Sequence, residues 1–154
     1  MARRTAHPRR QRPAAHVRSS ACPCGLAEPY EKCCGRFHRG EAAAPTAEAL
    51  MRSRYSAFVR QDEPYLLRTW HPRTRPARIG FDPGMRWTGL EITGTGDGTA
   101  FHTTGTVTFR ASYRGGSLCE RSRFERVDGA WVYVDGDIDE DPGDGVQGAR
   151  TSSS

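Results

Sequence analysis

The second half of the chain alternates between apolar and polar positions. Residues 99–114 alternate for most of their length, with Val107, Phe109 and Tyr113 at odd positions and mainly His, Thr, Arg and Ser at even ones. A period of two is typical of a strand with one buried face. The pattern therefore predicts a strand here, and it predicts a further strand over residues 87–92.

Two glycine-containing turns fix the predicted pairing of the strands. Gly115-Gly116 and Asp128-Gly129 are typical two-residue hairpin turns, and counting outward from a turn sets the register. The predicted facing pairs are Tyr113–Leu118, Ala111–Glu120, Phe109–Ser122, Phe124–Tyr133 and Ser122–Asp135. Both hairpins share one apolar face, which is expected to form the core: Val107, Phe109, Tyr113, Leu118, Phe124, Trp131 and Tyr133.

A helical pattern precedes the strands. Apolar residues recur at helical spacing over residues 47–60, and Thr46 is a suitable N-cap residue. Asp62 and Pro64 predict the start of a second, shorter helix. That helix is expected to end at Trp70, because the next residue precedes a proline and is disfavoured in a helix.

The two ends of the chain differ in composition from the body. Residues 1–20 carry six arginines and no acid, whereas residues 136–154 carry five acids and one arginine, within a net charge of +5. We predict a disordered basic arm over residues 1–20 and a disordered acidic tail over residues 137–154. Between them, residues 41–136 are predicted to form an α+β domain, a cone of two helices on a curved antiparallel sheet, with residues 71–85 as a loop.

Composition also excludes several classes of protein. No stretch approaches the 18 apolar residues of a membrane span, and the arginine-rich start lacks the apolar segment of a secretory signal. A cytoplasmic location is therefore expected, where cysteines stay reduced. The positive charge belongs mostly to the first residues, so specific DNA binding by the folded part is not predicted.

Four cysteines follow the basic arm. Cys22, Cys24, Cys33 and Cys34, here called the cysteine cluster, lie in the segment CPCGLAEPYEKCC. Four thiolates match the tetrahedral preference of structural zinc. Residues 21–40 have too few large apolar groups for a core of their own, and a structural zinc contributes about 10–16 kcal/mol in small modules. We predict a zinc module over residues 21–40.

Other interpretations of these cysteines stay open. Free or redox-active thiols are one, and a disulfide between the two pairs is another, although a reducing cytoplasm disfavours it. His38 is a candidate replacement ligand, and Lys32 and Arg36 are either neutralisers of a zinc–thiolate centre with net charge −2 or ordinary solvated charges. Cys119 is predicted to be a lone thiol on a strand.

The cysteine cluster resembles the SEC-C zinc motif, which is known from the C-terminal end of the translocation ATPase SecA. Carried over by position, the ligands of the motif fall on the four clustered cysteines, although the chain has Gly25-Leu26-Ala27 where the motif commonly has Gly-Ser-Gly. The likeness to the bacterial YchJ family extends through LMRSRYSAFV (50–59), TWHP (69–72), ERSRF (120–124) and WVYVDG (131–136). The resemblance implies a SEC-C motif followed by a domain of the nuclear-transport-factor-2-like (NTF2-like) superfamily. It implies no particular reaction, because the family has no settled activity.

The predicted register places polar side chains on the apolar face of the sheet, where Arg54 could also approach them. The predicted pocket residues are Arg52, Tyr55, Trp70 and Ser122, and the candidate catalytic residues are Glu120, Asp135 and His71. Buried carboxylates are costly unless they are paired. They could line a pocket, but a structural network of ion pairs between helix and sheet is the favoured interpretation.

Two functions follow, and neither names a reaction. The first is a zinc-stabilised interaction protein that binds a protein or ribonucleoprotein partner through the zinc module and the basic arm. The second is a small-molecule-binding or hydrolase/isomerase-like domain using the pocket around Glu120. No nucleophile motif or phosphate-binding loop is present, so a non-enzymatic role is favoured.

A solvent-connected opening beside Glu120 would favour the second function, and a filled cone the first. The oligomeric state is not predicted.

Overall fold

The computed structural model describes residues 21–142, which fold as an α+β domain. A 3₁₀ turn, η1 (Tyr30–Lys32), precedes the helices α1 (Cys34–His38), α2 (Ala47–Arg60) and α3 (Glu63–Arg68). The strands β1 (Trp87–Asp97), β2 (Thr104–Tyr113), β3 (Gly116–Val127) and β4 (Ala130–Pro142) form one antiparallel sheet in the order β1-β2-β3-β4. The predicted fold class is confirmed.

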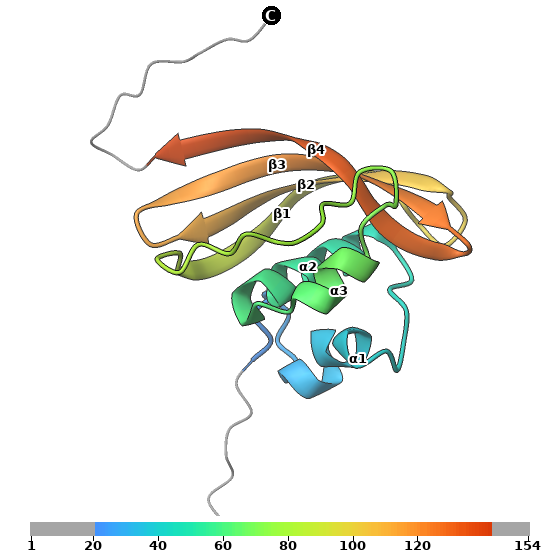
Figure 1. The fold of residues 1–154 in the computed structure, drawn as a ribbon, viewed down its shortest axis with the longest axis horizontal. Coiled ribbons are helices and arrows are strands. Elements are labelled where there is room, and N and C mark those ends of the chain that lie inside the picture. The colour runs from blue at the N-terminus through green and yellow to red at the C-terminus, as the bar shows by residue number, and fades with distance from the viewer. Residues whose placement is uncertain (1–20, 143–154) are drawn as a thin grey trace, which may run out of the picture.

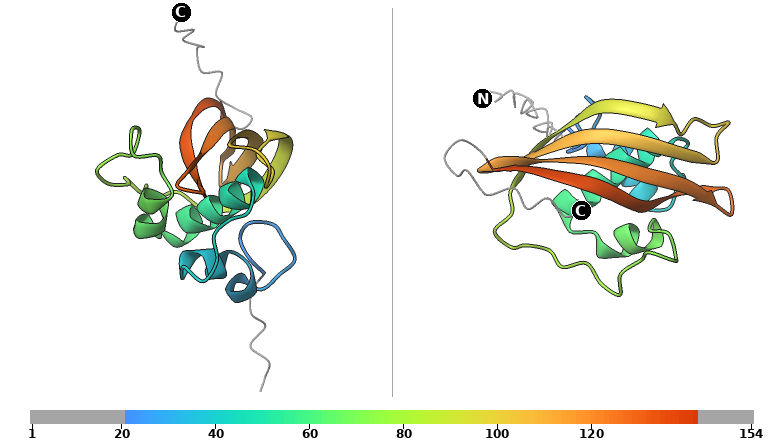
Figure 2. Two further views of the ribbon diagram at one scale, coloured as in Figure 1. Left: turned by 90° about the vertical axis from the view of Figure 1, so that its right-hand side faces the viewer. Right: turned by 90° about the horizontal axis from the view of Figure 1, so that it is seen from above.

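The elements are stacked in layers (Figure 1). The sheet curves over α2, which covers its concave face. Helix α3 lies beside α2, and the segment with the cysteines and α1 lies against the other side of α2. Seen from above, none of the helices α1, α2 and α3 covers the convex face of the sheet (Figure 2). Helix α2 is therefore in contact with both the sheet and the cysteine module.

The helix boundaries follow from their capping residues. The Thr46 side chain accepts a hydrogen bond from the Ala49 amide at 3.1 Å, and Asp62 accepts one from the Tyr65 amide at 3.2 Å. Each bond satisfies an amide that the first turn of a helix leaves free. The predicted α2 is confirmed, whereas α3 ends at Arg68, earlier than predicted.

The core lies between α2 and the sheet. Its buried members are Ala47, Leu50, Met51, Tyr55, Val107, Phe109, Ala111, Phe124 and Trp131. Four residues of the predicted core face are in this cluster, and Tyr133 packs against it. The other two predicted members, Tyr113 and Leu118, are half-buried, because they lie toward the hairpin end of the sheet.

The register of the first hairpin differs from the prediction. Tyr113 pairs with Gly116, so the turn is Arg114-Gly115 rather than Gly115-Gly116, and Gly115 has a φ of 105° that favours glycine. The predicted pairs are wrong by two residues: Ala111 pairs with Leu118, Phe109 with Glu120 and Val107 with Ser122. A shift of two keeps every side chain on its predicted face.

A bulge in β4 overturns part of the second hairpin. Phe124 pairs with Tyr133 as predicted, but Arg123 pairs with Asp135, which leaves Val134 as an extra residue. The predicted pair of Ser122 and Asp135 is therefore wrong, because a one-residue insertion moves Asp135 to the other face. Ser122 pairs instead with Gly136.

Two predicted segment boundaries also need correction. β4 continues to Pro142, past the predicted start of the acidic tail at residue 137, because residues 137–142 pair with the first half of β3. β1 extends to Asp97, past the predicted end of this strand at residue 92. The predicted basic arm and the remainder of the acidic tail lie outside the described residues.

Two arginines of the convex face lie on neighbouring strands without facing each other. Arg110 pairs with Glu91 and Cys119, and Arg121 pairs with Thr108 and Asp137. In the part of the chain that the structure describes, no helix is long and apolar enough to cross a membrane.

Replacing Thr46 with Ala is expected to lower the free energy of unfolding by about 1 kcal/mol, because the Ala49 amide loses its acceptor. Urea unfolding followed by circular dichroism measures this change. Thr46→Ser keeps the oxygen and should retain most of the stability. An equal loss in both variants would contradict capping as the cause.

Candidate functional site

The cysteine cluster is brought together by a loop that folds back on itself. Ala21 bridges to Pro29, and the Cys22 amide donates to the Glu28 carbonyl at 2.8 Å. The four Sγ atoms lie within 4.8 Å of one another, and all four side chains are buried. A tetrahedral ion with metal–sulfur bonds of about 2.3 Å places its sulfurs roughly 3.8 Å apart. The cluster is therefore fit to bind a metal ion.

No disulfide links the five cysteines, all of which are in the part of the chain that the structure describes. Burial raises the pKa of the Cys33 thiol to about 12, and hydrogen bonding to Cys22 and Cys24 raises the pKa of Cys34. Four adjacent thiolates repel one another, and a divalent cation relieves that repulsion. Cys119 lies on β3, apart from the cluster, as predicted.

Helix α2 supplies the polar contacts of the cluster. Arg52 donates from Nη1 to the Cys24 carbonyl at 2.7 Å, and the Ser56 hydroxyl lies 3.4 Å from Cys22 Sγ. The prediction that Arg52 lines the pocket is wrong, because its side chain extends toward the cysteines. Lys32 is exposed, and Arg36 lies over the ring of Phe37 at 5.3 Å.

His38 fixes the module to α2 and is not placed as a metal ligand. Its Nε2 donates to the Ser53 carbonyl at 2.8 Å, which leaves Nδ1 as the acceptor for the Tyr30 hydroxyl. Burial lowers the pKa of His38, which favours this neutral form. The alternative that His38 replaces a cysteine ligand is therefore wrong, since both ring nitrogens are engaged elsewhere.

The second candidate site is a cavity of about 240 Å³ between α2 and the concave face of the sheet, here called the cone pocket. Its lining is Met51, Arg54, Tyr55, Phe58, Trp70, Trp87, Phe109, Ala111, Leu118, Glu120, Ser122, Tyr133 and Ile138. The structure thus brings Glu120 together with Tyr55, Trp70 and Ser122. Ile138, which is 60% exposed, marks the side of the pocket that opens to solvent.

Glu120 is held in place by its neighbours on β4. The Tyr133 hydroxyl donates to Glu120 Oε1 at 2.7 Å. Burial and this hydrogen bond raise the pKa of Tyr133, so the phenol keeps its proton. The carboxyl group lies against Gly136, where an added Cβ would come within 2.8 Å of its Cδ atom. Only glycine leaves room for the carboxylate in this position.

Arg54 forms the helix side of the cone pocket. It is 3% exposed, and its Nη1 donates to the Leu66 carbonyl at 2.8 Å and to Thr69 Oγ1 at 2.7 Å. The guanidinium carbon lies over the ring of Trp70 at 4.9 Å and over that of Tyr133 at 4.8 Å. Burial lowers the pKa of Arg54 to about 10, so the group is still a cation at neutral pH.

Two fully buried polar atoms of the cone pocket, besides those of Arg54, have no hydrogen-bond partner among the described side chains. They are Ser122 Oγ, in a side chain that is 1% exposed, and the buried indole nitrogen Nε1 of Trp70. Buried polar atoms are almost always paired in folded proteins. Their position in the wall of a cavity indicates that a bound molecule can satisfy them.

Two of the candidate catalytic residues lie elsewhere. Asp135 is on the convex face, where it accepts a hydrogen bond from Arg123. His71 lies 3.9 Å from Glu125 and accepts from the Arg73 amide, so it does not line the cone pocket. The sequence failed to place Asp135 because nothing in it signals the bulge at Val134.

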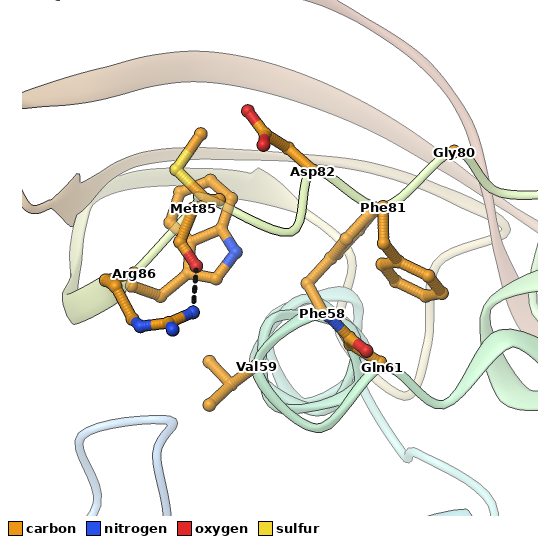
Figure 3. A pocket seen from close by; sticks show the side chains of 9 residues that line it. Phe58, Val59, Gln61, Gly80, Phe81, Asp82, Met85 and Arg86 are labelled. Carbon is orange, nitrogen blue, oxygen red and sulfur yellow. Dashed lines mark hydrogen bonds between the residues drawn. The ribbon is translucent and has the colours of Figure 1, made fainter.

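A second hollow of about 300 Å³ adjoins the cone pocket. Its walls come from the end of α2, with Phe58, Val59 and Gln61, and from the loop of residues 80–86 (Figure 3). Phe58 and Trp87 line both cavities, so these two rings separate them. The adjoining hollow contains none of the unpartnered atoms described above.

Comparisons with known proteins agree with this geometry. The family model described as "YchJ, middle NTF2-like domain" matches residues 46–136. A UPF0225 protein of Streptomyces coelicolor is 83% identical over 117 residues, covering 76% of this chain and 94% of that protein. A UPF0225 protein of Corynebacterium glutamicum is 52% identical over 121 residues, covering 77% and 97%.

Two solved structures resemble the fold. The solution structure of a SEC-C motif containing protein from Rhodopseudomonas palustris has a TM-score of 0.67 at 32% identity, covering 77% of this chain and 98% of that one. The crystal structure of a SEC-C motif containing protein from Psychrobacter arcticus has a TM-score of 0.63 at 25% identity, covering 75% and 80%.

The fold and the cysteine cluster together define an NTF2-like α+β domain that carries a SEC-C-type cysteine module. The chain belongs to the YchJ family, whose relatives carry the name UPF0225. The resemblance drawn from the sequence is confirmed.

Replacing Gly136 with Ala is expected to displace the Glu120 carboxylate and to break its bond to Tyr133, at a cost of roughly 1–3 kcal/mol in the free energy of unfolding. Urea unfolding measures the loss. Gly89→Ala in β1 is the matched control, because an added methyl there meets nothing within 4 Å. Equal stability of the two variants would show that Gly136 does not position the carboxylate.

Proposed function

We propose that this protein is a zinc-stabilised binding protein whose cone pocket holds a small, largely apolar molecule. One observation carries the proposal: a solvent-connected cavity beside Glu120, lined by aromatic side chains, in which Ser122 Oγ and Trp70 Nε1 find no partner among the side chains that the structure describes. Binding sites for small molecules are typically concave and apolar, with a few placed polar groups. At about 240 Å³ the cavity suits a ligand smaller than most cofactors.

Zinc supports the pocket indirectly in this proposal. Four buried thiolates are the ligand set that structural zinc prefers, and the spacing of the sulfurs fits a tetrahedral ion. Arg52 and Ser56 join the cluster to one side of α2, and Met51, Arg54 and Tyr55 line the pocket from the same helix. We take the protein to act in the cytoplasm, where thiols remain available to a metal.

Capture of a protein or ribonucleoprotein partner, placed first by the sequence, is the second candidate. The exposed loop of residues 25–28 supports it, with Leu26 44% exposed beside the cysteines. One exposed leucine is common on protein surfaces and does not form an apolar patch. The open cavity is the feature that favours a ligand, so partner capture takes second place.

Catalysis is not included in the proposal. The pocket holds one carboxylate, and that carboxylate is bonded to a tyrosine that keeps its proton. Asp135 and His71, the other two candidate catalytic residues, lie outside the pocket. The groups that remain are suited to binding and orienting a molecule.

Elemental analysis of protein purified without added metal should give one zinc ion per chain. Cys34→Ser is expected to lose most of this zinc and at least about 3 kcal/mol of unfolding free energy, because the metal supplies folding energy to the module. Cys119→Ser, outside the cluster, is the matched control and should keep its zinc. Equal zinc content in both variants would contradict the metal assignment.

The apolar pocket should bind 1-octanol, a probe small enough for the cavity, with a heat detectable by isothermal titration calorimetry. Ala111→Leu places a larger side chain in the pocket and is expected to weaken binding at least about tenfold. Ala130→Leu adds the same atoms at an exposed position of β4 and should bind as the natural protein does. Octanol that fails to bind the natural protein, or binding unaffected by Ala111→Leu, would argue against the proposed function.

A further inference from the structure

We infer that the ligand of the cone pocket is a small apolar molecule with a single carboxylate, and that Arg54 and Trp70 bind the carboxylate. The inference rests on the proposed function and deepens it by naming the chemical class of the ligand. Its basis is the set of hydrogen-bond donors in the pocket that have no acceptor.

Arg54 is a buried cation without an ion-pair partner among residues 21–139, whose side chains the structure describes. No carboxylate oxygen of these residues lies within 4.0 Å of its guanidinium nitrogens, although the group is 3% exposed. Buried arginines are almost always paired, because an isolated charge is costly to remove from water. Stacking against Trp70 and Tyr133 offsets part of this cost. A ligand anion would supply the missing partner.

The guanidinium of Arg54 also has N–H groups that donate to no acceptor. Arginine has five N–H groups, and both bonds described here come from Nη1, to the Leu66 carbonyl and Thr69 Oγ1. Nε and Nη2 therefore have no acceptor within the described chain. Two such nitrogens on a planar fork are the arrangement that binds a carboxylate through two parallel bonds.

The other two polar atoms of the pocket without a partner can also donate hydrogen bonds. Trp70 Nε1 can only donate, and the Ser122 hydroxyl can donate as well as accept. Because Trp70 stacks on Arg54, its indole nitrogen belongs to the same end of the pocket. The polar end of a matching ligand is therefore an acceptor, and the cation beside it favours a negative one.

Glu120 fixes where such a carboxylate can lie. Tyr133 stands between the two charges, with its ring under Arg54 at 4.8 Å and its hydroxyl on Glu120 at 2.7 Å. A ligand carboxylate is attracted to the Arg54 side and repelled from the Glu120 side. A second anionic group would have to approach Glu120, so the pocket selects a monoanion. The rest of the wall is apolar and includes Met51, Phe109 and Leu118. It suits a ligand whose remaining part is a hydrocarbon chain or an aromatic ring.

The test compares three probes that differ only at one end: n-octanoate, 1-octanol and n-octylammonium, each titrated calorimetrically into the full-length natural protein. Octanoate is expected to bind at least about tenfold more tightly than octanol, because its contact with Arg54 is a charge-assisted pair. Octylammonium should bind most weakly, since its charge meets Arg54.

Three substitutions assign the effect to residues. Arg54→Met should abolish the preference for octanoate over octanol. Trp70→Phe breaks no hydrogen bond within the described chain, so it provides the test if Arg54→Met fails to fold, and it should weaken octanoate about three- to tenfold. Glu120→Gln keeps an acceptor for Tyr133 and removes the like charge, so the preference for octanoate over octanol should rise several-fold.

The outcomes separate the two proposals. Octanol binding without a preference for octanoate, or tighter binding of octylammonium, would overturn the carboxylate inference and leave the binding function standing. A weaker preference for octanoate over octanol in Glu120→Gln would also overturn the inference, because it would make the carboxylate of Glu120 a favourable contact. If none of the three probes binds, the proposed function fails and the inference fails with it.

Discussion

Helix α2 is the element on which the rest of the structure depends, because it is packed on both sides. The cysteine module contacts one side through Arg52, Ser53 and Ser56, and the sheet contacts the other through Met51 and Tyr55. Ser53 and Ser56 are completely buried although both are polar. A helix with buried residues on opposite sides needs a partner on each of those sides. The module provides the second partner.

This arrangement explains why a short segment with so few apolar residues can fold. The module has the four cysteines and Tyr30 as its own buried cluster. It gains further stability by hydrogen bonding to α2, which the sheet already positions. Metal binding would make the module rigid, and the rigid module would in turn hold one wall of the cone pocket. In this view the metal and the pocket are linked through one helix.

The sequence predicted the fold class, the long helix with its cap and the cysteine cluster, because each depends on local signals. Two parts of the site depend on details that are not local. The turn at Arg114-Gly115 and the bulge at Val134 together decide which residues face the pocket. The bulge moved Asp135 to the convex face, while the two-residue shift of the first hairpin left Glu120 and Ser122 in place. No pattern of apolar residues distinguishes a regular strand from one with a bulge.

The two arginines of α2 illustrate the same limit. Residues two apart on a helix point about 200° away from each other. Arg52 therefore contacts the Cys24 carbonyl while Arg54 enters the pocket. Both were candidates for the pocket, and sequence spacing shows only that they diverge. Choosing between them requires the position of the sheet, which long-range pairing determines.

Hydrogen–deuterium exchange of the natural protein, before and after removal of metal with a chelator, tests the link between the two sites most directly. If the metal holds α2 in place, the amides around Arg52 to Ser56 should exchange markedly faster after chelation, and those of the central β2–β3 hairpin much less so. Unchanged exchange in α2 after complete metal removal would contradict this account, because the pocket wall would then be stable without the metal.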